Sequence, residues 1–273
     1  MNVNKKCLAA AGAAALILPV CLVAPGKASK ELKAPFFGRN FAHRGLHSRD
    51  KSVPENSLLA FRLAAEAGYG IELDVQLSLD GQVVVFHDDT LERVCGINER
   101  VENMPYSALH EISLCSTEET IPLFSDVLDV IAGRGPIICE LKTGSRNREL
   151  CEKTYELISA YDGDICIESF NPWIVSWFRF HAPELFRGQL AMPAEFYDKS
   201  LGLPLAVSLS CVLGNFFCRP HFIAYKLGRR PLPVRLSEAL GAVKVAWTSH
   251  EPRSEGENDC VIFEFYKPRI RFK

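Results

Sequence analysis

The chain has 273 residues, of which 48% are hydrophobic and 23% are charged, and this is the composition of an ordinary globular protein. A chain of this length is long enough for one large domain with its own core. Its formal net charge of -2 gives no basic field, which excludes nucleic acid as the expected partner.

Residues 1–33 are predicted to stand apart from this domain as a membrane anchor or a signal segment. Residues 7–25 carry no charge and follow Lys5 and Lys6, which fits a single membrane span or a secretory signal. An uncleaved anchor is our first choice. More basic residues follow the segment than precede it, so the positive-inside rule favours a cytoplasmic domain, with an extracellular or secreted domain as the alternative.

The domain itself is expected over residues 38–273, and its first short strand ends at residues 41–45. His43 and Arg44 lie at the mouth of that strand, where a lone histidine is more often structural than catalytic. Residues 54–57 then open a helix whose apolar side chains cover one broad face.

The central stretch covers residues 71–88 and contains an Asp-Gly pair, residues 80–81, between two runs of β-forming residues. This pattern predicts a hairpin. If the pair forms the whole loop, Asp74 lies opposite His87, and Glu72 shares the strand face of Asp74 because side chains alternate along a strand. Two carboxylates and a histidine therefore converge, although a solvated strand face could hold the same residues.

Strands and helices alternate through the rest of the chain. A buried strand at residues 136–142 holds Glu140 and Lys142 on one face, where they either pair with each other or serve a site. About eight strands separated by helices favour an α/β fold, a closed TIM (β/α)8 barrel, with the hairpin as a local extension after the second strand. The expected later elements are helices at residues 124–132, 148–161 and 173–180, and strands at residues 165–170, 186–191, 222–225, 243–247 and 261–265.

Six short motifs, taken in order, resemble those of the glycerophosphodiester phosphodiesterase family. They are His43-Arg44-Gly45, Pro54-Glu55-Asn56-Ser57, Glu72-Leu73-Asp74-Val75, Asp80-Gly81, His87-Asp88 and Glu140-Leu141-Lys142. Ser169-Phe170-Asn171 and Trp247-Thr248 extend the resemblance to the later strands. Each motif alone is weak, but their order and spacing together are specific.

The resemblance implies a TIM-type barrel that binds one divalent cation, Mg²⁺ or Ca²⁺, and hydrolyses a glycerophosphodiester or a lysophospholipid to glycerol phosphate and an alcohol. The metal ligands that it implies are Glu72, Asp74 and Glu140. The implied general acid and base are His43 and His87, and the phosphate-binding side chains are Arg44 and Lys142. Three carboxylates suit a hard cation, and a phosphodiester needs its charge neutralised during displacement.

The later half of the chain departs from the family pattern at Ser249-His250 and at Ile262-Phe263-Glu264, and residues 192–235 resemble nothing that we can align. These differences spare the reaction core but leave the head group of the substrate open. Two alternatives remain, a sphingomyelinase or phospholipase D-type activity on the same fold and a barrel that only binds phosphorylated ligands. The expected partners are a small or lipid-derived phosphodiester and, through the N-terminal segment, a membrane.

Overall fold

The computed structural model describes residues 19–273, in which eight parallel strands close into a barrel. The strand order β1-β9-β8-β7-β6-β5-β4-β2, closed by pairing of β1 with β2, confirms the predicted (β/α)8 architecture. The strands are β1 (Asn40–Ala42), β2 (Gly70–Leu77), β4 (Ile137–Leu141), β5 (Ile165–Ser169), β6 (Arg187–Ala191), β7 (Phe222–Lys226), β8 (Val243–Ser249) and β9 (Cys260–Phe263).

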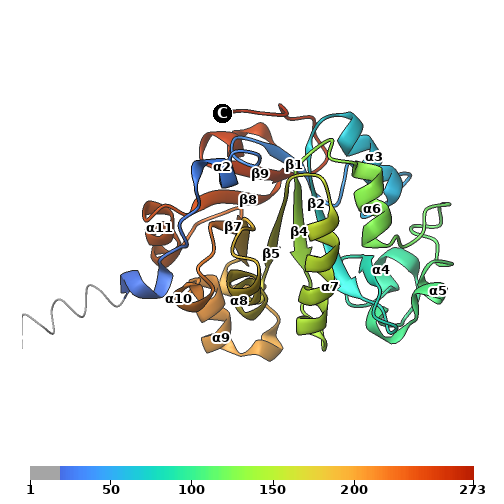
Figure 1. Cartoon of the computed structure of the whole chain (residues 1–273), viewed down its shortest axis with the longest axis horizontal. Coiled ribbons are helices and arrows are strands. Elements are labelled where there is room, and N and C mark those ends of the chain that lie inside the picture. Colours follow the sequence, from blue (N-terminus) through green and yellow to red (C-terminus); the bar gives the residue numbers. More distant parts are fainter. Residues whose placement is uncertain (1–18) are drawn as a thin grey trace, which may run out of the picture.

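Helices surround these strands, as Figure 1 shows. The first long one, α3, begins where the Ser57 hydroxyl accepts a hydrogen bond from the Ala60 amide at 3.1 Å, which satisfies a free donor of the first turn. Its buried Phe61 packs in one core cluster with Ile71 and Leu73 of β2. The helices are α2 (Lys30–Lys33), α3 (Leu58–Glu66), α4 (Glu92–Cys95), α5 (Tyr106–Leu109), α6 (Phe124–Ile131), α7 (Asn147–Ala160), α8 (Pro172–His181), α9 (Leu203–Ser210), α10 (Asn215–Cys218) and α11 (Leu232–Ala239).

Strand β2 is buried on both faces, but the two faces differ in chemistry. Ile71, Leu73 and Val75 pack against the surrounding helices. Glu72 and Asp74 alternate with them and are also buried, so they lie on the opposite face, inside the barrel. The alternation along this one strand therefore separates the core of the fold from an acidic interior.

The predicted hairpin is present, but its register differs by one residue from the prediction. β2 pairs antiparallel with β3 (Val83–Val85), and Val75 lies opposite Val85. Asp74 consequently lies beside Phe86, whose amide donates to the Asp74 carbonyl at 3.0 Å, and not opposite His87.

A longer loop causes this shift. Gly81 has a φ of 77°, but Asp80 does not adopt a positive φ, so the pair cannot form the two-residue turn that needs both. Instead the Ser78 hydroxyl accepts a hydrogen bond from the Gln82 amide at 2.9 Å and donates to Asp80 at 2.6 Å. The loop therefore runs over residues 78–82.

Residues 86–123 form an excursion between β3 and β4 with an apolar cluster of its own, which includes Phe86, Leu91 and Leu109. Its helices α4 and α5 lie together at the lower right of Figure 1, on the other side of the barrel from α9 and α10. The excursion thus extends one side of the barrel without adding a barrel strand.

Packing of the barrel begins before residue 38, where the sequence places the start of the domain. Val23 is buried, and the Gly26 amide donates to the Pro220 carbonyl at 2.8 Å. Phe36 stacks on Phe186 with ring centroids 5.3 Å apart and belongs to the cluster that fills the barrel interior. The barrel domain therefore includes part of the segment assigned to residues 1–33.

The predicted anchor, residues 7–25, falls mainly on residues that lie outside the described range, and its role stays a prediction. Between residues 19 and 273, no helix has the length and apolar character that crossing a membrane requires.

Candidate active site

A cavity of about 280 Å³ opens where the barrel strands end at their carboxyl termini. In (β/α)8 barrels this is the face at which active sites are built. Six of the seven predicted site residues line the cavity, and the seventh, Asp74, lies beside them. The six are His43, Arg44, Glu72, His87, Glu140 and Lys142. The structure therefore brings together side chains that lie up to about one hundred residues apart in the sequence.

Glu72, Asp74 and Glu140 form a buried acidic cluster. One ligand oxygen from each lies within 4.8 Å of the others. Parallel pairing explains the convergence, because β2 and β4 are neighbours and Asp74 stands directly opposite Glu140. Burial, and then the charges of its acidic neighbours, raises the pKa of Glu72 well above its usual value. Burial likewise raises the pKa of Glu140.

Two basic side chains partly compensate this negative charge. Lys142 Nζ lies 2.8 Å from Glu140 Oε1 and 3.4 Å from Asp74 Oδ1, and Arg44 Nε lies 3.5 Å from Asp74 Oδ2. The Asn56 amide donates to the same Asp74 oxygen at 2.9 Å. Although burial alone would raise the pKa of Asp74, the positive charges around it hold that pKa well below its usual range.

The donor set fits a hard divalent cation. Carboxylate oxygens are the ligands that Mg²⁺ and Ca²⁺ prefer, and these three groups converge within the reach of one ion. Two of them also have raised pKa values, because burial and mutual repulsion disfavour their charged forms. A bound cation relieves that repulsion, since it neutralises the charges at the point where they crowd.

Arg44 combines an uncommon backbone conformation with contacts to acidic side chains. Its φ of 53° lies in the left-handed region, which is uncommon for a residue with a side chain. In this conformation its amide donates to Glu72 Oε2 at 3.0 Å, while its guanidinium donates to Glu55 at 2.6 Å. The next residue, Gly45, also has a positive φ, 79°, and a side chain there would clash with Ala60. The loop after β1 thus fixes Arg44 over the acidic cluster.

His43 lies between the acidic cluster and a second carboxylate. Its Nδ1 lies 3.2 Å from Glu264 Oε1, and its Nε2 lies 4.0 Å from Glu72 Oε2. Burial lowers the pKa of His43 to about 4, although the hydrogen bond to Glu264 acts in the opposite direction. The imidazole of His43 is therefore neutral near pH 7, and its Nε2 is directed toward Glu72 of the acidic cluster.

Glu264 holds more than one histidine. His47 Nε2 lies 3.3 Å and His250 Nδ1 lies 3.8 Å from its two oxygens. Both Glu264 and His250 stand at positions where the sequence departs from the family pattern. The positions at which the sequence departs from the family pattern therefore lie near His43, and the three acidic residues of the cluster are not among them.

His87 enters the cavity from the end of the hairpin. Its Nδ1 lies 2.5 Å from Asp88 Oδ1, and Arg93 contacts the other oxygen of Asp88. Arg93 also forms an ion pair with Glu55, the partner of Arg44. A continuous series of charged contacts thus connects the phosphate-binding candidate Arg44 with His87, and both residues line the cavity.

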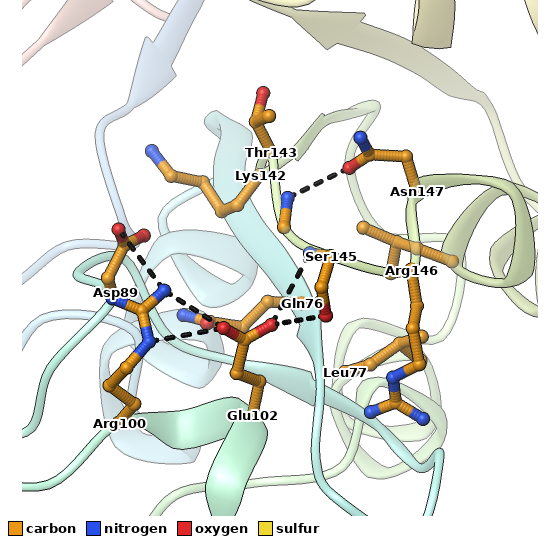
Figure 2. Close-up of a pocket in the computed structure, with 12 residues that line it drawn as sticks. Gln76, Leu77, Asp89, Arg100, Glu102, Lys142, Thr143, Ser145, Arg146 and Asn147 are labelled. Carbon is orange, nitrogen blue, oxygen red and sulfur yellow. Dashed lines mark hydrogen bonds and ion pairs between the residues drawn. The ribbon is translucent and has the colours of Figure 1, made fainter. Parts of the chain in front are cut away.

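A short polar network holds the loop that follows Lys142. Figure 2 shows Glu102 between Arg100 and Ser145, with the Ser145 hydroxyl donating to Glu102 at 2.8 Å and Arg100 Nη2 lying 3.0 Å from it. The Gly144 amide donates to Asn147 at 2.8 Å. These contacts fasten the loop after β4 to the excursion, which limits the positions that Lys142 can take.

Glu168 is a cavity residue that the sequence prediction missed. It stands opposite Glu140 in the β4–β5 pairing, is only 1% exposed, and its Oε2 has no hydrogen-bond partner among the described residues. Burial, and then the charges of Glu72, Glu140 and Asp74, raises its pKa well above the usual value. The signal was present in the predicted strand at residues 165–170, because alternation places Glu168 on the same face as Phe170.

Residues 43–265 match the Glycerophosphoryl diester phosphodiesterase family. The chain belongs to this family. Its members and this chain thus share the region from the first cavity histidine to the residue after Glu264.

Individual relatives agree with the family match. The chain is 33% identical over 164 residues to the glycerophosphodiester phosphodiesterase of Bacillus altitudinis, which covers 56% of this chain and 66% of that protein. It is 30% identical over 143 residues to lysophospholipase D GDPD1 of Homo sapiens, which covers 48% of this chain and 44% of that one. Across three curated bacterial relatives, the matched region spans between about half and two thirds of the relative's own length.

Solved structures support the fold over nearly the whole barrel. A phosphodiesterase of Oleispira antarctica in complex with the product sn-glycerol-3-phosphate has a TM-score of 0.68 at 22% identity, over 83% of this chain and 93% of that one. A glycerophosphodiester phosphodiesterase of Thermotoga maritima has a TM-score of 0.61 at 25% identity, over 82% and 93% of the two chains. The likeness to the first of these shows the shared fold.

We predict that, in the absence of a bound cation, the free energy of unfolding of the Glu168→Gln variant increasingly exceeds that of wild type as pH rises. The raised pKa keeps a proton on folded Glu168 that the unfolded chain releases above about pH 4.5. The stability from this carboxyl is therefore present at low pH and lost as pH rises towards the folded pKa. Glutamine has nearly the same shape and does not titrate. The difference in free energy of unfolding between Glu168→Gln and wild type should therefore widen by up to about 1.4 kcal/mol per pH unit.

Urea unfolding between pH 5 and pH 8, in the presence of a chelator, measures this gap. Glu156 is exposed, so the substitution Glu156→Gln serves as the control, and its difference in free energy of unfolding from wild type should not change with pH. A gap between wild type and Glu168→Gln that stays constant across the range would contradict the prediction.

Proposed function

We propose that this chain is a metal-dependent phosphoric diester hydrolase that cleaves a glycerophosphodiester to glycerol phosphate and an alcohol. The observation that carries the proposal is the single cavity in which two histidines, three carboxylates and two basic side chains meet. The glycerophosphodiester phosphodiesterase of Bacillus altitudinis and the Oleispira antarctica phosphodiesterase in complex with sn-glycerol-3-phosphate, to which this chain is similar, support the same substrate class.

The proposed cation ligands are Glu72, Asp74 and Glu140, and the proposed cation is one Mg²⁺ or Ca²⁺. When bound, the cation supplies charge neutralisation to the phosphate oxygens as the displacement proceeds. Arg44 and Lys142 lie on two sides of the cluster and bind the phosphate through charged hydrogen bonds. The substrate phosphorus is thereby held beside both histidines.

The proton transfers are assigned from the surroundings of each histidine. His43 is neutral near pH 7 and is positioned by Glu264, so it accepts a proton from the attacking hydroxyl of water or of the glycerol. His87, positioned by Asp88, donates a proton to the departing alkoxide. In the net reaction the oxygen of water bonds to phosphorus, the phosphorus–oxygen bond to the alcohol breaks, and the alcohol leaves with one proton.

A substrate panel with product identification tests the function. The full-length chain, supplied with Mg²⁺ or Ca²⁺, should release glycerol phosphate from glycerophosphodiesters, and a chelator should abolish the activity until either cation is restored. Sphingomyelin in the same panel distinguishes the sphingomyelinase-type alternative. Binding of phosphodiesters without turnover at any cation concentration would instead indicate a barrel that only binds.

We predict that His43→Ala and His87→Ala each lower kcat by about 10² to 10⁴-fold, the usual contribution of one general acid or base. Cation affinity should stay nearly unchanged, because the carboxylates already supply the ligands. A p-nitrophenyl phosphodiester has a leaving group that needs no protonation, so His87→Ala should recover on it and His43→Ala should not. Equal defects on both substrates, together with weakened cation binding, would contradict the assignment.

The proposed localisation is at a membrane, through residues 7–25, with the barrel on the cytoplasmic side. Removing residues 1–18 should then move the chain into the soluble fraction without lowering its melting temperature. Removing residues 1–33 should lower it by about 4 to 8 °C, because burial of Val23 and the packing of Leu32 together contribute about 2 kcal/mol. Digestion of the barrel by protease added to intact cells would contradict the cytoplasmic orientation.

A further inference from the structure

A second group of potential metal ligands lies next to the acidic cluster and contains two histidines. His43, His47 and Glu264 each offer one ligand atom, and these atoms lie within 4.8 Å of one another. We call these three residues the histidine cluster. Ala42 of β1 stands opposite Phe263 of β9, so the residues that follow them, His43 and Glu264, come side by side. The barrel itself therefore holds two members of the cluster together.

The spacing within the histidine cluster fits a tetrahedral ion. His43 Nδ1 lies 3.2 Å and His47 Nε2 lies 3.3 Å from the same oxygen of Glu264, Oε1. In tetrahedral sites Zn²⁺ binds nitrogen and oxygen at about 2.0 to 2.2 Å, which places neighbouring ligand atoms about 3.3 to 3.6 Å apart. The two separations in the cluster are therefore close to those that one Zn²⁺ requires.

His47 supplies an observation that hydrogen bonding within the cluster does not explain. Its side chain is only 9% exposed, and its Nε2 has no hydrogen-bond partner among the described residues, although Glu264 lies 3.3 Å away. His43, in contrast, is hydrogen-bonded to the same oxygen. A buried polar atom without a partner costs free energy. A metal ion between these side chains gives His47 Nε2 the partner that it lacks.

Two neighbouring rings complete the surroundings of the cluster. His250 Nδ1 lies 3.8 Å from Glu264 Oε2, and its side chain is 55% exposed, so the outer edge of the cluster faces solvent. The ring of Phe265 packs edge-on against His47, with centroids 4.9 Å apart, and parallel to His250 at 6.1 Å. Phe265 therefore limits the orientations of both histidines, and the fourth position of an ion is open to water or to His250.

The histidine cluster and the acidic cluster prefer different ions. Three carboxylates favour Mg²⁺ or Ca²⁺, whereas two imidazoles with one carboxylate favour a transition metal such as Zn²⁺. His43 stands between the two clusters, because its Nδ1 contacts Glu264 and its Nε2 lies 4.0 Å from Glu72 Oε2. One imidazole thus connects two groups of ligands with different metal preferences.

We propose that His43, His47 and Glu264 bind Zn²⁺ and that this ion reversibly inhibits the hydrolase. Binding of the ion is independent of the function proposed above, whereas inhibition rests on that function. A neutral imidazole that coordinates a metal through Nδ1 carries its proton on Nε2. The nitrogen of His43 that is directed toward Glu72 then has no free lone pair, so it cannot accept the proton of the attacking hydroxyl.

Titration of the full-length chain with Zn²⁺, in the presence of excess Mg²⁺ or Ca²⁺, tests the inhibition. Occupation of one site per chain should lower kcat by about 10² to 10⁴-fold, the contribution of one general base. A chelator that prefers Zn²⁺ should restore the activity, and raising the concentration of Mg²⁺ or Ca²⁺ should not. Recovery driven by Mg²⁺ or Ca²⁺ would show that Zn²⁺ competes at the acidic cluster, and this result or an absence of inhibition would overturn the proposal.

His47→Gln removes one ligand and leaves the proposed cation ligands and both acid–base histidines in place. Its affinity for Zn²⁺ and its sensitivity to Zn²⁺, relative to its own zinc-free activity, should fall at least about tenfold, since losing even an outer-shell partner costs that much. The control is His181→Gln, because His181 is exposed at the end of α8 and does not belong to the cluster. Equal inhibition of the two variants by Zn²⁺ would contradict the assignment.

A cobalt spectrum of wild type tests the site independently of catalysis and of the folding of any variant. Co²⁺ absorbs visible light strongly in tetrahedral sites and weakly in octahedral ones. Co²⁺ added to the chain in excess Mg²⁺ should absorb strongly, and one equivalent of Zn²⁺ should remove the absorption. Weak absorption alone would refute the zinc site. Failure of wild type to cleave any phosphodiester would refute the proposed function, and the cobalt spectrum would still decide whether the site exists.

Discussion

The burial of several carboxylates inside one barrel is the constraint that governs this molecule. Glu72, Asp74 and Glu140 are removed from water, and isolated buried charges are strongly unfavourable. Lys142 and Arg44 compensate part of that charge through direct contacts. The compensation is incomplete, because the pKa values of two of the three carboxyls remain raised. The rigid barrel holds the acids together, and their crowding is what makes the place suitable for a divalent cation.

The fold and the shared strand face of Glu72 and Asp74 could be predicted because both follow from local periodicity, whereas the family resemblance supplied Glu140 as the third carboxylate. Alternation along β2 puts Glu72 and Asp74 on the face opposite Leu73, and parallel pairing with β4 then brings Glu140 beside Asp74. Neither step depends on contacts between distant loops. The helices α3, α6, α7 and α8 were predicted for the same reason, since their apolar faces must cover a sheet that is buried on both sides, whereas α9, α10 and α11 were not predicted.

The parts that the sequence did not predict depend on exact loop geometry or on distant partners. The hairpin register was wrong because the Ser78 hydroxyl stabilises a longer loop than an Asp-Gly pair alone indicates. Glu168 was missed because alternation gives only the strand face on which it lies, and its closeness to the acidic cluster depends on the pairing of β5 with β4. The packing of Phe36 under the barrel could not be read from the sequence either, since its partner Phe186 lies far away along the chain.

The residues proposed for the reaction and those that line the neighbouring apolar pocket, beside α8 and α9, come from different parts of this chain. The seven residues assigned to the reaction lie between His43 and Lys142, on the first strands and their loops. Most of the residues that line the neighbouring apolar pocket come after β5, and several lie in residues 192–235, where the sequence shows no family motif although the family match spans them. A change in α9 can therefore alter what fits beside the cavity without moving a cation ligand or a histidine. The two sets of residues meet at Phe170 and Met192, which line both spaces.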